Sequence, residues 1–249
     1  MIDAAGEACV AAKLQLACFE RLGGPGWEAL GTAAAHARAA GLLVIADGKR
    51  GDVPVTAAAY AQALVGSTPT PFGDVDGLGV DAFTLNPLLG RDALAPLLDA
   101  AAAAGAGVFV LVRTSNAGAE ELQEARLDGG GTLSDRLADL VSELGEAQVG
   151  RSGLSDVGAV VGATAGPEAL ARLRRRMPRS VLLLPGVGAQ GGRIDDIAPA
   201  FEPGPAGGLV AASRAIVDAH RASAMAPAAA AAEAAERLRE TAWTLAQAV

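Results

Sequence analysis

Short apolar runs recur along the chain, each followed by a loop and a helical pattern, and this alternation is the feature that most constrains the fold. The runs are rich in Val and Leu and mostly apolar on both faces, as in parallel strands covered on both sides. Strands are predicted near Ala12–Leu16, Leu42–Asp47, Val80–Leu85, Val108–Arg113, Val157–Gly162, Val181–Pro185 and Gly208–Ala212. Helices are predicted at Pro25–Ala40, Asp92–Ala104, Thr132–Gly145, Pro167–Arg176 and Pro227–Ala248. The pattern predicts an α/β fold with a parallel sheet.

The length of the chain favours one domain spanning residues 1–249. A (β/α)8 TIM barrel typically needs about 250 residues and closes with about eight strands. Seven strands are visible here, and the chain opens at Ile2–Val10 with a helical pattern that meets the first strand at once. We therefore expect a barrel that lacks its N-terminal first strand. An open, doubly wound sheet is the structural alternative, and Val65–Gly79 is expected to be a loop.

Charge and hydropathy exclude several classes of partner. The net charge is -8, so nucleic acid and anionic membranes are poor partners, whereas a small anionic substrate remains possible if basic side chains line its pocket. The sequence shows neither an apolar run long enough to span a membrane nor a signal peptide, which predicts a soluble, cytoplasmic protein. Cys9 and Cys18 are interpreted as small core residues in a reducing compartment. Metal-ligand spacing is absent, so no metal site is expected.

A charged cluster follows the second predicted strand. Asp47, Lys49 and Asp52 lie within six residues, at the C-terminal strand end that faces the active site in a parallel barrel. Asp47 and Lys49 are two residues apart, so in an extended chain their side chains point the same way. Alternating charges of this kind are unfavourable when desolvated unless they are paired. They could hold a lysine protonated and press negative charge against a substrate; a solvated loop with a surface ion pair is the alternative.

Two further residues adjoin this cluster. Lys13 lies in the apolar context of the preceding strand. Such a lysine is usually a surface residue with a buried stem, but in an adjacent parallel strand it could face the same barrel mouth as Asp47 and Lys49. Thr56 precedes an Ala-rich run and could supply the hydroxyl that starts a helix.

The last two predicted strands each run into a short loop that could bind an anion. The first loop is glycine-rich and contains Gly188, Gln190 and Gly191, so its backbone N–H groups could approach a phosphate. The second carries Arg214, which can hold phosphate through two N–H donors. Loops after strands seven and eight of such barrels commonly bind phosphate. A dinucleotide fingerprint, which Gly186 to Gly191 matches literally, and a glycine turn without a ligand are the alternatives.

The pattern Asp47-x-Lys49-x-x-Asp52 followed by Thr56 closely resembles the signature of orotidine 5'-phosphate decarboxylases. The resemblance covers nearly the whole chain and is strongest to the longer bacterial branch. Its further blocks are AKLQLACFE at 12–20, NPLLGRDAL at 86–94, VLVRTSNAGA at 110–119, VGAVVGAT at 157–164 and PGVGAQGG at 185–192. The resemblance implies a cofactor-independent loss of CO2 from orotidine 5'-phosphate to give UMP. One departure is that no residue before Lys13 matches the family's ribose-binding Asp.

The resemblance also implies a role for each matching position. Lys49 would protonate C6 of the pyrimidine, Asp47 would lie near the substrate carboxylate, and Lys13 would complete the charged chain and touch the ribose. Asp52 and Thr56 would reach across a homodimer interface into the partner's site. The remaining positions are substrate-binding: Ser115 would bind the pyrimidine, Gln190 and Arg214 would bind the phosphate, and Gly188 and Gly191 would form its loop.

Two other functions remain open from the sequence. A phosphate-sugar aldolase or epimerase of the same barrel group would share the Asp-x-Lys strand end and the late phosphate loops. Such relatives often need a metal, whereas Lys13 and the TSNAG block at 114–118 favour the decarboxylase. A truncated homologue that binds ligands without turnover is the non-catalytic alternative.

Overall fold

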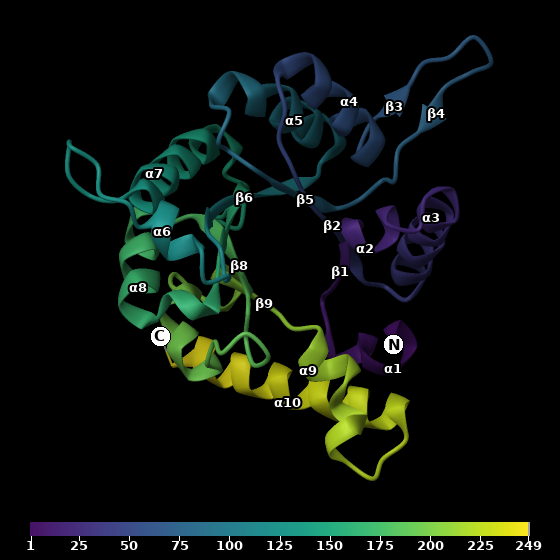
Figure 1. Ribbon diagram of the computed structural model, residues 1–249, viewed down its shortest axis with the longest axis vertical. Coiled ribbons are helices and arrows are strands. Elements are labelled where there is room, and N and C mark those ends of the chain that lie inside the picture. The colour runs from purple at the N-terminus through teal and green to yellow at the C-terminus, as the bar shows by residue number, and fades with distance from the viewer. Residues whose placement is uncertain (249) are drawn as a thin grey trace. The chain divides into compact units, whose positions relative to one another are not determined.

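The computed structural model describes residues 1–248 and contains all seven predicted strands (Figure 1). The strands are β1 (Ala11–Gln15), β2 (Leu43–Arg50), β3 (Ser67–Thr68), β4 (Val75–Asp76), β5 (Ala82–Leu85), β6 (Gly107–Arg113), β7 (Ser155–Val161), β8 (Ser180–Pro185) and β9 (Gly208–Ala211). The α-helices are α1 (Ile2–Ala5), α2 (Leu16–Glu20), α3 (Gly24–Ala39), α4 (Pro54–Leu64), α5 (Arg91–Ala104), α6 (Ala119–Gln123), α7 (Leu133–Gly145), α8 (Pro167–Arg176), α9 (Arg214–Val217) and α10 (Pro227–Gln247). Short 3-10 helices are η1 (Gly6–Ala8), η2 (Glu146–Gln148), η3 (Ala163–Ala165), η4 (Ile194–Phe201), η5 (Pro205–Gly207) and η6 (Ala219–Ala222).

The strand order distinguishes the two predicted architectures. The seven-stranded sheet has the order β1-β2-β5-β6-β7-β8-β9, so its strands follow one another as they do along the chain. A doubly wound sheet reverses direction at a switch point, and no reversal occurs among these strands. The described helices include none that is long and apolar enough to cross a membrane.

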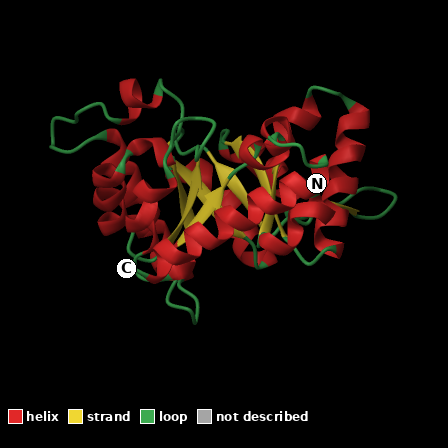
Figure 2. Cartoon of the chain, turned by 90° about the horizontal axis from the view of Figure 1, so that it is seen from below, coloured by secondary structure: helices red, strands yellow, loops and turns green. Residues whose placement is uncertain are grey.

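The chain forms two compact units that divide within β6. The N-terminal unit comprises Cys9–Phe109 with Ile2, and the C-terminal unit comprises the chain from Val110 onward with Met1 and Asp3–Ala8. Figure 2 shows helices beside the strands. The interpretation of residues 1–249 as one domain stays a prediction.

In the N-terminal unit, parallel strands β1, β2 and β5 carry helices α3, α4 and α5. Every residue of β5 and the middle of β2 are buried, and Val44, Phe83 and Leu85 are fully buried. Leu30 of α3 and Leu97 of α5 are buried as well. Burying a large apolar side chain contributes about 1.5–3 kcal/mol relative to leaving it exposed, so this packing fixes the strand ends that carry the charged cluster.

In the C-terminal unit, helix α7 packs on the parallel strands β7 and β8, and α8 packs against α7 and η4. Thr132 and Asp135 form a reciprocal capping box that begins α7. Arg174 of α8 is buried, and its guanidinium donates hydrogen bonds to the carbonyls of Met177, Ser180, Ala200 and Gly207. Burial lowers the pKa of Arg174 to about 10, so it stays charged at neutral pH. This side chain ties the end of α8 to β8, η4 and η5.

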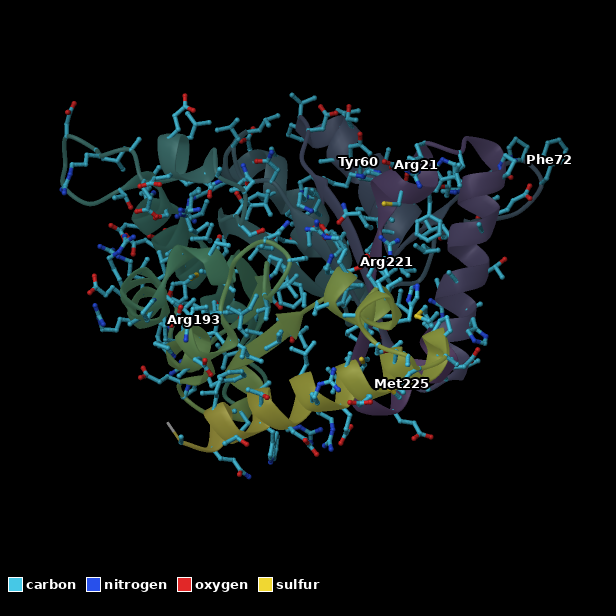
Figure 3. All side chains as sticks on the ribbon, turned by 60° about the horizontal axis from the view of Figure 1, so that its bottom comes forward. Arg21, Tyr60, Phe72, Arg193, Arg221 and Met225 are labelled. Carbon is cyan, nitrogen blue, oxygen red and sulfur yellow. The ribbon has the colours of Figure 1, made fainter. Side chains whose placement is uncertain are left out.

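Two predictions about the N-terminal unit are wrong. The segment Val65–Gly79 is not all loop, because β3 and β4 pair antiparallel within it. At the tip of this hairpin Phe72 is 99% exposed and projects into solvent (Figure 3). Cys18 is exposed rather than buried, since only Leu16 of the short helix α2 is buried, and Cys9 is only half-buried.

Candidate functional site

A bulge at the end of β2 carries the charged cluster. Ala46 pairs with Phe83 of β5, but the next paired residues are Arg50 and Leu85. Three residues of β2, from Asp47 to Lys49, therefore lie opposite the single residue Thr84. Bulges of this kind bend a strand and redirect side chains, often beside active sites.

Lys49 sits in the bulge with an unusual backbone conformation. Its φ is 49°, and it is the only non-glycine residue with positive φ in the described chain. This left-handed conformation costs roughly 1–2 kcal/mol for a residue with a Cβ. The neighbouring Gly48 is tightly enclosed, since a Cβ there would lie 2.6 Å from Cδ1 of Leu16. The side chains of Lys49 and Asp47 therefore come together because the chain bulges between them. The sequence had predicted a regular extended strand, in which residues two apart point the same way.

Asp47 holds two lysines with one carboxylate. Nζ of Lys13 lies 2.5 Å from Oδ2 of Asp47, and Nζ of Lys49 lies 2.5 Å from Oδ1. The Asp47 side chain is 8% exposed, whereas those of Lys13 and Lys49 are 24% and 42% exposed. The cluster is thus buried at its carboxylate and open at its ammonium groups. The alternative of a solvated loop with a surface ion pair is wrong.

These two lysines are the only lysines in the sequence, where the other 18 of 20 basic residues are arginine. Arginine keeps its proton at all relevant pH values, whereas a lysine can donate one. Counting lysines along the sequence would have pointed to both residues without any family resemblance.

The electrostatics of Asp47 are set by burial and by its two partners. Burial by itself would raise the pKa of the carboxyl, but the charge of Lys13 and the hydrogen bonds and charge of both lysines lower the pKa below its ordinary value. Asp47 is therefore ionised at neutral pH. Gln15 supports the same residue by donating from Nε2 to its backbone carbonyl at 3.0 Å.

The lowered pKa of Asp47 predicts how stability depends on pH. A carboxyl with a lower pKa in the folded state stabilises the fold above its unfolded pKa, and the contribution is lost as pH falls through the folded pKa. The ordinary value is 3.8. The difference in unfolding free energy between wild type and Asp47→Asn should stay constant from about pH 7 to about pH 5 and shrink only below about pH 4. Urea unfolding measures this; a difference already lost by about pH 5 would contradict the lowered pKa.

Arg50 fixes the far side of the bulge. Its guanidinium forms an ion pair with Glu20 of α2 and lies 5.1 Å from the ring centre of Tyr60 on α4. Tyr60, which belongs to the N-terminal unit, is labelled in Figure 3. The backbone carbonyl of Arg50 accepts a hydrogen bond from the N–H of Asn86 at 2.8 Å. These contacts join β2 to two helices and to the loop after β5.

Asp52 and Thr56 lie just beyond the bulge but outside the lysine cluster. The carboxylate of Asp52 accepts the N–H of Val53 at 2.8 Å and pairs with no cation among the described residues. Thr56 is exposed in the first turn of α4. The prediction that its hydroxyl starts the helix is wrong. Helix α4 begins at Pro54, two residues earlier, and Val53 precedes it without a side-chain cap.

The glycine-rich loop after β8 closes on itself. The N–H of Gly188 donates to the carbonyl of Gly192, and the N–H of Gly191 donates to the carbonyl of Gly188. Both glycines have positive φ angles, of 77° and 93°, which explains why glycine is needed there. Their part in phosphate binding stays a prediction. The loop leads into the 3-10 helix η4 instead of opening an α-helix, which contradicts the dinucleotide alternative.

Three further predicted substrate-binding residues, besides the two loop glycines, lie in the C-terminal unit. The hydroxyl of Ser115 donates to Oε1 of Gln190 at 2.6 Å, so the loops after β6 and β8 meet through these two side chains. Arg214 is the first residue of α9, is exposed, and forms no ion pair with any residue that the structure describes. Its guanidinium is thus available to an anion.

The comparisons with known proteins agree on one family. The sequence model of the orotidine 5'-phosphate decarboxylase / HUMPS family matches residues 1–233. An orotidine 5'-phosphate decarboxylase from Rhodopirellula baltica is 47% identical over 221 residues, which cover 89% of this chain and 72% of that protein. One from Deinococcus radiodurans is 46% identical over 210 residues, covering 84% and 71%.

The solved structures include an OMP decarboxylase from Leishmania donovani. Its sequence identity to this chain is 30% and the TM-score is 0.77, with 100% of this chain and 85% of that chain covered. Together with the sequential strand order, this likeness confirms the predicted fold class, an α/β barrel of the TIM type.

Proposed function

Because the chain belongs to the orotidine 5'-phosphate decarboxylase family, we propose that it converts orotidine 5'-phosphate to UMP and CO2 in pyrimidine biosynthesis, without a metal or another cofactor. The observation that carries the proposal is the buried Asp47 carboxylate held between the only two lysines of the chain. The relatives it matches are decarboxylases, and no feature of the site favours an aldolase, an epimerase or an inactive ligand-binding homologue.

The proposed chemistry is carried by Lys49 and Asp47. The bond between C6 and the carboxylate carbon breaks, CO2 leaves, and the electron pair remains on C6. Nζ of Lys49 then donates a proton to C6 and recovers one from solvent. A fixed ammonium beside a developing carbanion is worth more in a site shielded from water than in bulk solution. Asp47 would repel the substrate carboxylate, and loss of CO2 relieves that repulsion.

The proposed roles of the other residues follow their chemistry. Lys13 keeps Asp47 ionised and contacts the ribose. Ser115 binds the pyrimidine, and Gln190 and Arg214 bind the phosphate. Phosphate binding remote from C6 can supply energy that is realised mainly in the transition state. We further propose that the enzyme is cytoplasmic.

The reaction is tested by mixing the protein with orotidine 5'-phosphate in buffer with EDTA and following the absorbance change. Conversion to UMP supports the proposal and shows that no free metal is needed. A pure, folded protein that binds UMP but gives no conversion would refute decarboxylation and favour the ligand-binding alternative.

Arg214→Ala is expected to weaken UMP binding about ten- to hundredfold, because a hydrogen-bonded charge on the phosphate contributes about 1.5–3 kcal/mol. Isothermal titration with UMP measures the loss. Arg193→Ala is the matched control, since Arg193 is also exposed and directly follows the glycine-rich loop after β8, but is paired with Asp195. Binding of uridine, which has no phosphate, should be unchanged in both variants; an unchanged UMP affinity in Arg214→Ala would remove that residue from the site.

A homodimer is proposed from the surface around Asp52 and Thr56. Val53, Val55 and Leu88 are exposed beside these residues, Val55 by 86% and Leu88 by 79%. The loops that carry them start side by side, where Arg50 bonds to Asn86. Exposed apolar clusters of this kind mark protein interfaces. The unpaired carboxylate of Asp52 would enter the partner's site.

Mixed dimers test this exchange. Lys49→Ala and Asp52→Ala should each be inactive alone. If Asp52 acts in the partner's site, random mixing of the two variants should restore about a quarter of wild-type activity, because half of the dimers are mixed and each has one intact site. Activity is measured after unfolding and refolding the variants together. Absence of any recovery, with mixed dimers shown to form, would place Asp52 in its own chain's site.

A further inference from the structure

Thr84 is the one residue of β5 that lies opposite the bulge of β2. The pairs Ala46–Phe83 and Arg50–Leu85 enclose Thr84 on one strand and three residues on the other. A regular ladder cannot satisfy three residues with one partner, so a side chain must take over part of the hydrogen bonding.

The hydroxyl of Thr84 provides this hydrogen bonding both as an acceptor and as a donor. It accepts the backbone N–H of Lys49 at 2.8 Å and donates to Oδ1 of Asp47 at 3.1 Å. The same Oδ1 receives Nζ of Lys49 at 2.5 Å. Thr84 is 1% exposed, so water does not replace these bonds. One hydroxyl thus connects the strained backbone of Lys49 to the carboxylate that holds its ammonium.

We infer that Thr84 is a positioning residue that fixes Lys49 for proton donation. The inference rests on the proposed decarboxylation and adds a residue that the family motif does not include. The left-handed conformation at Lys49 persists only if its surroundings hold it. Without the Thr84 hydroxyl the Lys49 N–H and one lone pair of Asp47 lose their partner, and Nζ loses its fixed position while the charges of the cluster remain.

Thr84→Val and Thr84→Ser separate the hydroxyl from the volume of the side chain. Valine is nearly isosteric but makes neither bond, whereas serine keeps the hydroxyl and loses only the methyl group. Thr84→Val should lower kcat about ten- to hundredfold, since hydrogen bonds that involve charged groups are worth about 1.5–3 kcal/mol. The KM for orotidine 5'-phosphate should change less than about threefold, because the loss affects the transition state. Thr84→Ser should stay within about threefold of wild type in kcat.

Ser155→Ala provides the matched control for a purely structural loss. Ser155 is also buried, and its hydroxyl likewise accepts a backbone N–H, that of Val157, and donates to an oxygen, the carbonyl of Gly145. It begins β7, away from the loops that follow the strands. Ser155→Ala should lower the melting temperature and leave kcat unchanged.

Hydrogen exchange of the Lys49 amide gives a readout that does not depend on turnover. The amide should exchange at least about tenfold faster in Thr84→Val than in wild type, and Thr84→Ser should restore protection. Equal protection in all three proteins overturns the inference even if wild type is inactive, in which case the proposed function fails separately. In an active enzyme, an unchanged kcat in Thr84→Val, or an equal loss in Thr84→Ser, also overturns it.

Discussion

Lys49→Ala is expected to lower kcat at least about ten-thousandfold, which is the largest effect predicted for any single substitution. The variant loses the proton donor and the positive charge beside C6, and each of these effects alone is worth about a hundredfold or more. The fold should persist, because the Lys49 side chain is partly exposed and the hydrogen bond from its backbone to Thr84 does not need it. Single-turnover measurements with excess enzyme would capture so slow a reaction.

Lys49→Arg tells whether charge or proton donation matters more. Arginine keeps the ion pair with Asp47 but holds its proton too tightly to serve as a general acid. We expect it to be nearly as inactive as Lys49→Ala while unfolding at a urea concentration closer to that of wild type. A kcat of Lys49→Ala within about tenfold of wild type would refute the mechanism, and high activity in Lys49→Arg would assign Lys49 an electrostatic role alone.

Asp47→Ala is expected to lower kcat at least about a thousandfold, for a different reason. The variant leaves the ammonium groups of Lys13 and Lys49 near each other with no carboxylate between them, so the two positive charges repel each other and Nζ of Lys49 loses its fixed position. The substrate carboxylate would then meet only positive charge. We therefore expect the KM for orotidine 5'-phosphate to fall or stay constant while kcat falls, the pattern of a removed ground-state repulsion.

Asp47→Asn refines this result. The amide preserves the shape of the carboxyl group and can still accept one hydrogen bond, but it carries no charge. If the charge of Asp47 is what matters, both variants should show the same split between kcat and KM. A KM that rises strongly in either variant would instead show that Asp47 helps to bind the substrate, which contradicts its proposed repulsive role.

The sequence predicted the strands and their order of appearance because their signal is local. The run of apolar residues from Leu42 to Asp47 identifies β2, and the predicted helix at Pro167–Arg176 agrees with α8 to the residue. The β3–β4 hairpin was missed because strands of two residues leave no periodic pattern and the flanking glycines and prolines predict a loop.

The geometry of the site could be predicted less well from the sequence. The contact between Lys13 and Asp47 could be expected from adjacent parallel strands, and the structure confirms it. The bulge and the positive φ of Lys49 could not, because they depend on how many residues of β5 lie opposite β2, which no local pattern of β2 records. Thr84 was missed for the same reason: within β5 it reads as one more residue of a buried strand.

Both lysines of the chain lie in paired strands and contact the same carboxylate, so the sites at which a lysine-specific protease can cut are confined to the charged cluster. An endoprotease that cuts only after lysine has two target bonds, one within β1 and one within β2. Neither can enter a protease while its strand is paired, so cleavage requires those strands to open. Digestion by such a protease therefore measures how often the N-terminal sheet opens at the site, and a ligand that binds only the closed form should slow it.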